Sequence, residues 1–113
     1  MADYYKPLSQ ADIEEELMRL SALLEEATDD YAILAEDEAK KAARHKSAWA
    51  TAYIREEGAV KYRESMADYK TEDSLYDMKI AEALTKAKRE KMLSLRSSMD
   101  ALRTLAANVR AQT

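Results

Sequence analysis

The residues best suited to chemistry in this sequence are basic side chains at helical spacing. Within REKMLSLRSSMDALRTLAANVR an arginine returns at every seventh position, namely Arg89, Arg96, Arg103 and Arg110. Guanidinium groups in such a row can bind a phosphate backbone, or they can pair with carboxylates on a neighbouring helix. The hydrophobic register around the row favours one of these alternatives.

This arginine row lies beside an apolar stripe whose residues alternate spacings of three and four. With Met92 at heptad position a and Leu95 at d, the arginines occupy position e, where interhelical ion pairs form. A similar stripe runs from Ile13 to Leu34, flanked by Glu14, Glu16, Asp30 and Asp37. We therefore expect the row to pair with an acidic helix. The two stripes predict an oligomer seam that contains Leu17, Leu20, Leu24, Met92, Leu95, Met99, Leu102 and Val109.

A second basic group is interleaved with aromatic residues in the middle of the chain. Its candidate members for nucleic-acid binding are Lys61, Arg63, Lys40, Lys41, Arg44, Tyr62 and Tyr69. Positive charge beside aromatic rings suits single-stranded nucleic acid, because charge follows the phosphates and each base has a face to stack. Alternatively, tyrosines at helical spacing form a core and the lysines form its solvated face.

Enzyme chemistry has little support in the sequence. The only histidine, His45, has no acidic residue three or four positions away that would complete a helical metal pair. One glycine cannot form a nucleotide-binding loop, and the absence of cysteine excludes thiolate sites and disulfides. We expect a non-enzymatic protein with no catalytic residue, no metal and no cofactor.

Composition predicts an all-α protein of one domain. The chain has 113 residues with only Gly58 and Pro7 as helix breakers, and strong helix formers dominate it. Residues 1–38 hold twelve acids and two bases, whereas residues 39–113 hold ten acids and sixteen bases. No apolar run is long enough to span a membrane, and MADYYKPLSQ lacks signal-peptide features. We expect a cytoplasmic protein with an acidic arm and a basic body.

The expected architecture is an elongated helical hairpin of two long helices with coiled-coil seams, which forms oligomers. Residues 1–8 are an extended leader, and 9–113 form one helical domain. Ser9, with Asp12 three residues later, caps a helix over about 9–69, in which Gly58 introduces only a mild kink. A turn at about 70–74 then leads to a helix over about 74–111. One unbroken rod is the alternative, because Tyr62, Met66, Tyr69, Tyr76, Ile80 and Leu84 keep an approximate four-three rhythm across that turn.

The stretch VKYRESMADY resembles phage recombination mediators of the UvsY type, through Lys61, Arg63, Asp68 and Tyr69. An acidic helical start, a central Lys-x-Arg element followed by Asp-Tyr, and a long C-terminal helix are shared with that family. The resemblance implies that Lys61 and Arg63 contact single-stranded DNA. It also implies a helical oligomer that helps to load a recombinase onto strands coated by a single-strand binding protein.

The leading functional hypothesis is thus a non-enzymatic phage-type accessory factor of homologous recombination, located in the host cell cytoplasm. Its partners would be further copies of itself, single-stranded DNA, and a recombinase or single-strand binding protein. The alternatives are a protein-binding inhibitor or adaptor that uses the acidic N-terminal helix, and a scaffold-like structural coiled coil.

Overall fold

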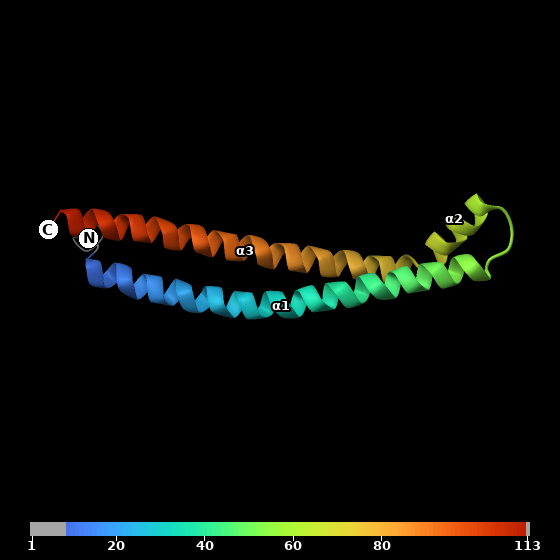
Figure 1. The fold of residues 1–113 in the computed structure, drawn as a ribbon, viewed down its shortest axis with the longest axis horizontal. Helices are drawn as coiled ribbons and strands as arrows, with labels where there is room; N and C mark the ends of the chain where they lie inside the picture. The colour runs from blue at the N-terminus through green and yellow to red at the C-terminus, as the bar shows by residue number, and fades with distance from the viewer. Residues whose placement is uncertain (1–8, 113) are drawn as a thin grey trace, which may run out of the picture. The chain divides into compact units, whose positions relative to one another are not determined.

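A computed structural model describes residues 9–112 as three helices, α1 (Gln10–Arg55), α2 (Val60–Lys70) and α3 (Glu72–Ala111) (Figure 1). No strand occurs among these residues, which confirms the predicted all-α class. The predicted leader at 1–8 lies outside the described residues. The helices contribute to two compact units. Unit 1 holds residues 9–29 and 89–112, and unit 2 holds residues 30–88.

The first helix begins with the predicted capping box. The backbone N–H of Asp12 donates to Oγ of Ser9 at 3.1 Å, and the backbone N–H of Ser9 donates to Oδ2 of Asp12 at 3.1 Å. These reciprocal bonds satisfy donors that the first turn of a helix leaves without a partner. The start of α1 is therefore fixed by two local side chains.

In unit 1 the acidic start of α1 pairs with the C-terminal part of α3, as the hairpin prediction requires. The residues buried there recur every seventh position on each helix, and they are Ile13, Leu20, Ala27, Met92, Met99 and Ala106. Leu17, Leu24, Leu95, Leu102 and Val109 flank them and are half-buried. The seam that the sequence assigns to an oligomer is thus already used within one chain, and oligomerisation stays a prediction.

The chain reverses direction at residues 56–59, so the prediction of one helix over 9–69 is wrong. α1 ends at Arg55, and α2 runs back beside the end of α1 in Figure 1. Gly58 has a φ of 118°, a left-handed conformation that other residues rarely adopt. A Cβ at this position would lie 3.2 Å from the Tyr62 ring. Gly58 therefore allows a tight reversal, whereas the sequence predicts only a kink.

Packing between the two arms explains why the reversal occurs here. Nε and Nη2 of Arg63 donate to the backbone carbonyl of Tyr53 at 3.2 and 3.0 Å. This carbonyl lies in the last turn of α1, where carbonyl groups lack helical partners. A glycine within a helix costs only about 1 kcal/mol, so the local signal is weak, and the contacts formed across the loop decide the outcome.

The predicted turn at 70–74 is also wrong, because only Thr71 interrupts the helices there. Its Oγ1 donates to the Ala67 carbonyl at 2.7 Å, and its own carbonyl accepts from the backbone N–H of Leu75 at 3.0 Å. Such back-bonding by a threonine often bends a helix, and here it joins the end of α2 to the start of α3 without a loop. Thr71 is 5% exposed, so it faces the interior of unit 2 as helical residues do.

Small side chains form the interior of unit 2. Its buried residues are Ala67, Thr71, Ala81 and Thr85, and the half-buried Ser74 and Met78 complete a four-three row. Oγ1 of Thr85 lies 3.2 Å from the carbonyl of Leu34, a contact between a short side chain and the backbone of the other arm. The small residues therefore allow α1 and α3 to approach closely in this unit.

One antiparallel register describes the pairing within unit 2. Contacts between the arms join Tyr53 to Arg63, Trp49 to Asp68, His45 to Ser74, Leu34 to Thr85, and Asp30 to Lys88. The two residue numbers of each pair add up to between 116 and 119. The pairing is thus centred on the Gly58 loop, which excludes a register centred on residues 70–74.

In this register, most of the apolar row that the sequence predicts between Tyr62 and Leu84 faces outward. Tyr62, Tyr69, Tyr76, Ile80 and Leu84 are exposed, because the row that faces α1 consists of the smaller residues beside them. On α1 the seam continues beyond Leu34 through the half-buried Glu38 and Lys41. Ala39, which lies between these two positions in the sequence, is exposed. Polar side chains with long apolar stems can occupy such positions.

We expect Ala81→Leu to destabilise the protein by about 1 to 3 kcal/mol, because added volume in a close helix contact forces the helices apart. Ala81 is 2% exposed, whereas Ala83 on the same helix is exposed and provides the matched control. Ala83→Leu should change the free energy of unfolding by less than about 0.5 kcal/mol. Urea denaturation followed by circular dichroism measures both, and equal losses would contradict the close contact.

Candidate functional site

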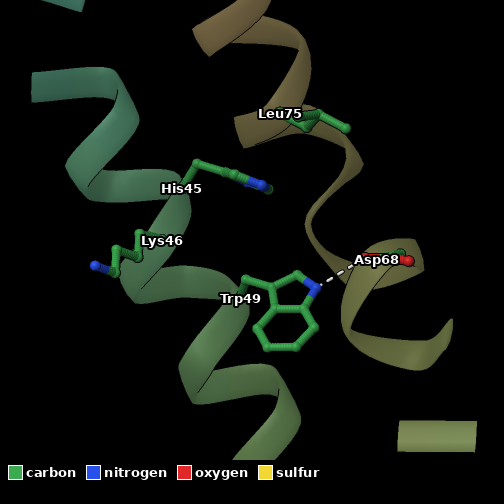
Figure 2. A pocket seen from close by; sticks show the side chains of 5 residues that line it. All are labelled: His45, Lys46, Trp49, Asp68 and Leu75. Carbon is green, nitrogen blue, oxygen red and sulfur yellow. Dashed lines mark hydrogen bonds between the residues drawn. The ribbon is translucent and has the colours of Figure 1, made fainter. Parts of the chain in front are cut away.

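The most distinctive side-chain cluster lies where α2 and the start of α3 meet the end of α1. His45, Lys46, Trp49, Asp68 and Leu75 line an open hollow of about 510 Å³ (Figure 2). Nε1 of Trp49 donates to Oδ1 of Asp68 at 2.8 Å. In Figure 2 His45 and Trp49 extend from α1 toward the facing segment, whereas the ammonium group of Lys46 points away from them. Only the stem of Lys46 therefore borders the hollow.

His45 forms a hydrogen bond between the two arms. Its Nδ1 lies 2.9 Å from Oγ of Ser74. The same Oγ donates to the Thr71 carbonyl at 3.0 Å. His45 thus anchors the start of α3 to α1, which is a structural role.

An aromatic stack connects this hollow to the reversal loop. The rings of Trp49 and Tyr53 stack with centroids 5.3 Å apart and planes 10° apart. The guanidinium carbon of Arg63 lies 4.2 Å from the centre of the Tyr53 ring, on which it forms a cation–π contact. Lys70 adds an ion pair with Glu56 at 2.7 Å. Aromatic and charged contacts together hold α2 against the end of α1.

The predicted nucleic-acid residues near the loop differ in their availability. Lys61 is exposed and has no ion pair within residues 9–112. Tyr62 and Tyr69 are 52% and 68% exposed, so they are not core residues in this chain. Arg63 is half-buried, and its hydrogen bonds and ring contact serve the fold. Lys61 and the two tyrosines are therefore accessible, whereas Arg63 is largely occupied.

The other predicted basic residues lie farther along α1. Lys40 pairs with Glu36 and Lys41 with Asp37, both at 3.0 Å. Arg44 is exposed and borders a small hollow with Lys41, Ser74 and Asp77. The helical rise and the pairing register place Lys41 roughly 20 Å from Lys61 along the axis of α1. The structure therefore does not gather the predicted basic residues into one patch.

The four members of the arginine row are all exposed on α3. Arg103 pairs with Asp100 of its own helix at 2.9 Å, and the interhelical role of the row stays a prediction. The expected acidic partners Glu16, Asp30 and Asp37 instead pair with Arg19, Lys88 and Lys41. Asp30 and Lys88 form an ion pair across the two arms of unit 2, at 3.4 Å.

A shallow apolar groove lies between the two arms of unit 1. It has a volume of about 420 Å³ and is lined by Glu16, Arg19, Leu20, Ser98, Ala101, Leu102 and Leu105. Nε of Arg19 donates to Oε2 of Glu16 at 3.0 Å. This hydrogen bond lowers the pKa of the Glu16 carboxyl group and raises the pKa of Arg19. Water reaches both side chains of this ion pair, so the pair contributes little to stability and mainly places charge at the rim of the groove.

A row that contains exposed tyrosine and isoleucine side chains runs along α2 and the start of α3. Its exposed members are Tyr62 and Tyr69 on α2 and Asp73, Tyr76 and Ile80 on α3. The half-buried Met66 lies in the same row, which we call the outer stripe. Spacings of four and three alternate along it, as they do along the buried row that begins at Ala67. The sequence indicates this arrangement through two adjacent rows, each with alternating spacings of four and three residues. The row of smaller residues gives the weaker signal, because its members are less hydrophobic.

Several specific functions receive no support from these residues. Within 9–112 no group of three or more histidine, aspartate or glutamate side chains is placed to hold a metal ion. In the same part of the chain, no helix has the length and apolar character needed to cross a membrane. Comparisons with protein families, with curated proteins and with solved structures return no match. The outer stripe and the exposed basic residues are the remaining candidates.

We expect Arg63→Ala to lower the free energy of unfolding by about 1 to 2 kcal/mol, because it removes the hydrogen bonds to the Tyr53 carbonyl and the contact with the Tyr53 ring. Lys61→Ala removes a neighbouring positive charge that has no such contacts, and it should change stability by less than about 0.5 kcal/mol. Urea denaturation, monitored by circular dichroism, compares the two variants. Equal effects would show that Arg63 has no structural role.

Proposed function

We propose that this protein is a non-enzymatic helical adaptor that binds another protein through the outer stripe. The observation that carries the proposal is a second four-three row, made of large side chains, on segments whose first row already faces α1. Four of its members, Tyr62, Tyr69, Tyr76 and Ile80, are between 41% and 68% exposed. A row with this rhythm is what one helix presents to another.

The energetic argument concerns the row as a whole. A single exposed apolar side chain is normal on a protein surface. Full burial of one such side chain is worth about 1.5 to 3 kcal/mol, so a regular row of them gives a partner helix several contributions of this size. Tyrosine suits such a surface, because its ring packs while its hydroxyl group stays in water.

The proposal places partner binding on the outer stripe and not on the acidic N-terminal helix. The sequence-based alternative assigns partner binding to the acidic N-terminal helix. In unit 1 this helix packs against α3 and buries Ile13, Leu20 and Ala27. The outer stripe, in contrast, has no covering segment within residues 9–112. It is therefore the better candidate for the binding surface.

We expect Tyr69→Glu combined with Ile80→Glu to abolish capture of a protein partner from an extract of the cells that express this chain. Ile33→Glu combined with Ile54→Glu is the matched control, because these isoleucines are 68% and 73% exposed and lie outside the stripe. Quantitative mass spectrometry should show partners retained by the wild type and the control but depleted about tenfold by the stripe variant. The same retained set for all three proteins would refute the proposal.

The second candidate is the function that the family resemblance implies, single-stranded DNA binding in support of homologous recombination. The observation that favours it is the exposure of Lys46, Lys61, Tyr62 and Tyr69, with no ion pair at either lysine among residues 9–112. Charge for phosphates and ring faces for bases are then both accessible.

For this candidate we expect a labelled single-stranded oligonucleotide to bind at low salt and to be released as salt rises. Lys46→Ala combined with Lys61→Ala should weaken binding while preserving the fold, since both side chains are exposed. Fluorescence anisotropy at two salt concentrations provides the measurement. An unchanged signal when wild-type protein is added at low salt would exclude DNA binding.

A further inference from the structure

The outer stripe carries one acidic residue at its centre. Tyr62, Met66 and Tyr69 precede Asp73, and Tyr76 and Ile80 follow it, all at spacings of four and three. The buried row keeps the same rhythm through Thr71 and Ser74. Because that row faces α1 on both sides of the bend, the adjacent outer stripe also continues from α2 into α3. Asp73 therefore interrupts a continuous apolar seam.

Around the centre of the stripe, the lysines have ion-pair partners, whereas two carboxylates do not. Lys70 pairs with Glu56 at 2.7 Å, and Lys79 pairs with Glu82 at 3.5 Å. Glu72 and Asp73 are exposed and have no ion pair within residues 9–112. Both lie in the first turn of α3, where they complement the helix dipole and keep their carboxylates in water. The open charge beside the seam is thus negative.

This charge disfavours two possible occupants. A second copy that presents the same stripe places the two Asp73 carboxylates opposite each other in a parallel pair, or in neighbouring layers in an antiparallel pair. Like charges at such a position oppose association. Nucleic acid would bring phosphates to an acidic centre, which is also unfavourable. The occupant that suits both the rhythm and the charge is a basic amphipathic helix.

We propose that the outer stripe binds a helix of another protein that presents apolar residues at four-three spacing and an arginine or lysine opposite Asp73. This inference rests on the proposed adaptor function and specifies its partner. The apolar side chains supply most of the affinity. The pairing with Asp73 selects the partner and its register, as a polar residue within a coiled-coil seam does.

The test uses the full chain and two labelled synthetic peptides of about 25 residues with identical apolar seams, one with arginine and one with glutamate at the seam centre. Fluorescence anisotropy should show about tenfold tighter binding of the arginine peptide to the wild type, and Asp73→Arg should reverse this preference. Glu90→Arg, which changes an exposed acid elsewhere on α3, should leave it unaltered.

The possible failures are distinguishable. Equal binding of both peptides by the wild type and Asp73→Arg would overturn the charge selection, while the adaptor function would still stand on the extract experiment. Sedimentation velocity without peptide provides the second arm. If the wild type self-associates and Tyr69→Glu combined with Ile80→Glu abolishes this association, the stripe binds a second copy of the chain. Displacement of the arginine peptide by a single-stranded oligonucleotide would assign it to nucleic acid.

Discussion

The close approach of α1 to the α2–α3 segment determines where each large side chain of unit 2 lies. The contact between the Thr85 hydroxyl group and the Leu34 carbonyl, at 3.2 Å, requires a short side chain at this position. Ala67, Thr71 and Ala81 meet the same requirement along the row. Since small residues occupy the space between the helices, the tyrosines and isoleucines of α2 and α3 remain outside. The close contact between the helices therefore explains both the small interior residues of this unit and its exposed apolar side chains.

A thin interior makes the polar contacts around the reversal more important. Hydrophobic burial scales with apolar area, and alanine and threonine contribute little of it. The hydrogen bonds of Arg63, Trp49 and His45 compensate in part, because each joins residues on opposite arms. Trp49 contributes both an aromatic contact and a hydrogen bond. Its ring stacks on Tyr53 while its N–H group bonds to Asp68.

The sequence predicts those features that depend on local or strongly hydrophobic signals. The Ser9–Asp12 capping box, the all-α class and the N-terminal stripe are of this kind. The reversal point differs from the predicted one because Thr71 and Ser74 resemble a helix cap, whereas an isolated glycine is a weak local signal. Contacts formed across the loop, such as the one between Arg63 and Tyr53, decide between them. The same contact across the loop explains why Arg63, but not Lys61, is occupied within the candidate site.

The single antiparallel register also implies an order of assembly. Contacts in unit 2 join residues 10 positions apart at the Tyr53–Arg63 pair and 58 apart at the Asp30–Lys88 pair. Each contact formed near the Gly58 loop shortens the free chain that the next contact must close, and the entropic cost of closure grows only slowly with loop length. The hairpin of unit 2 can therefore fold as a zipper that starts at its loop, and the Asp30–Lys88 pair at its other end forms last.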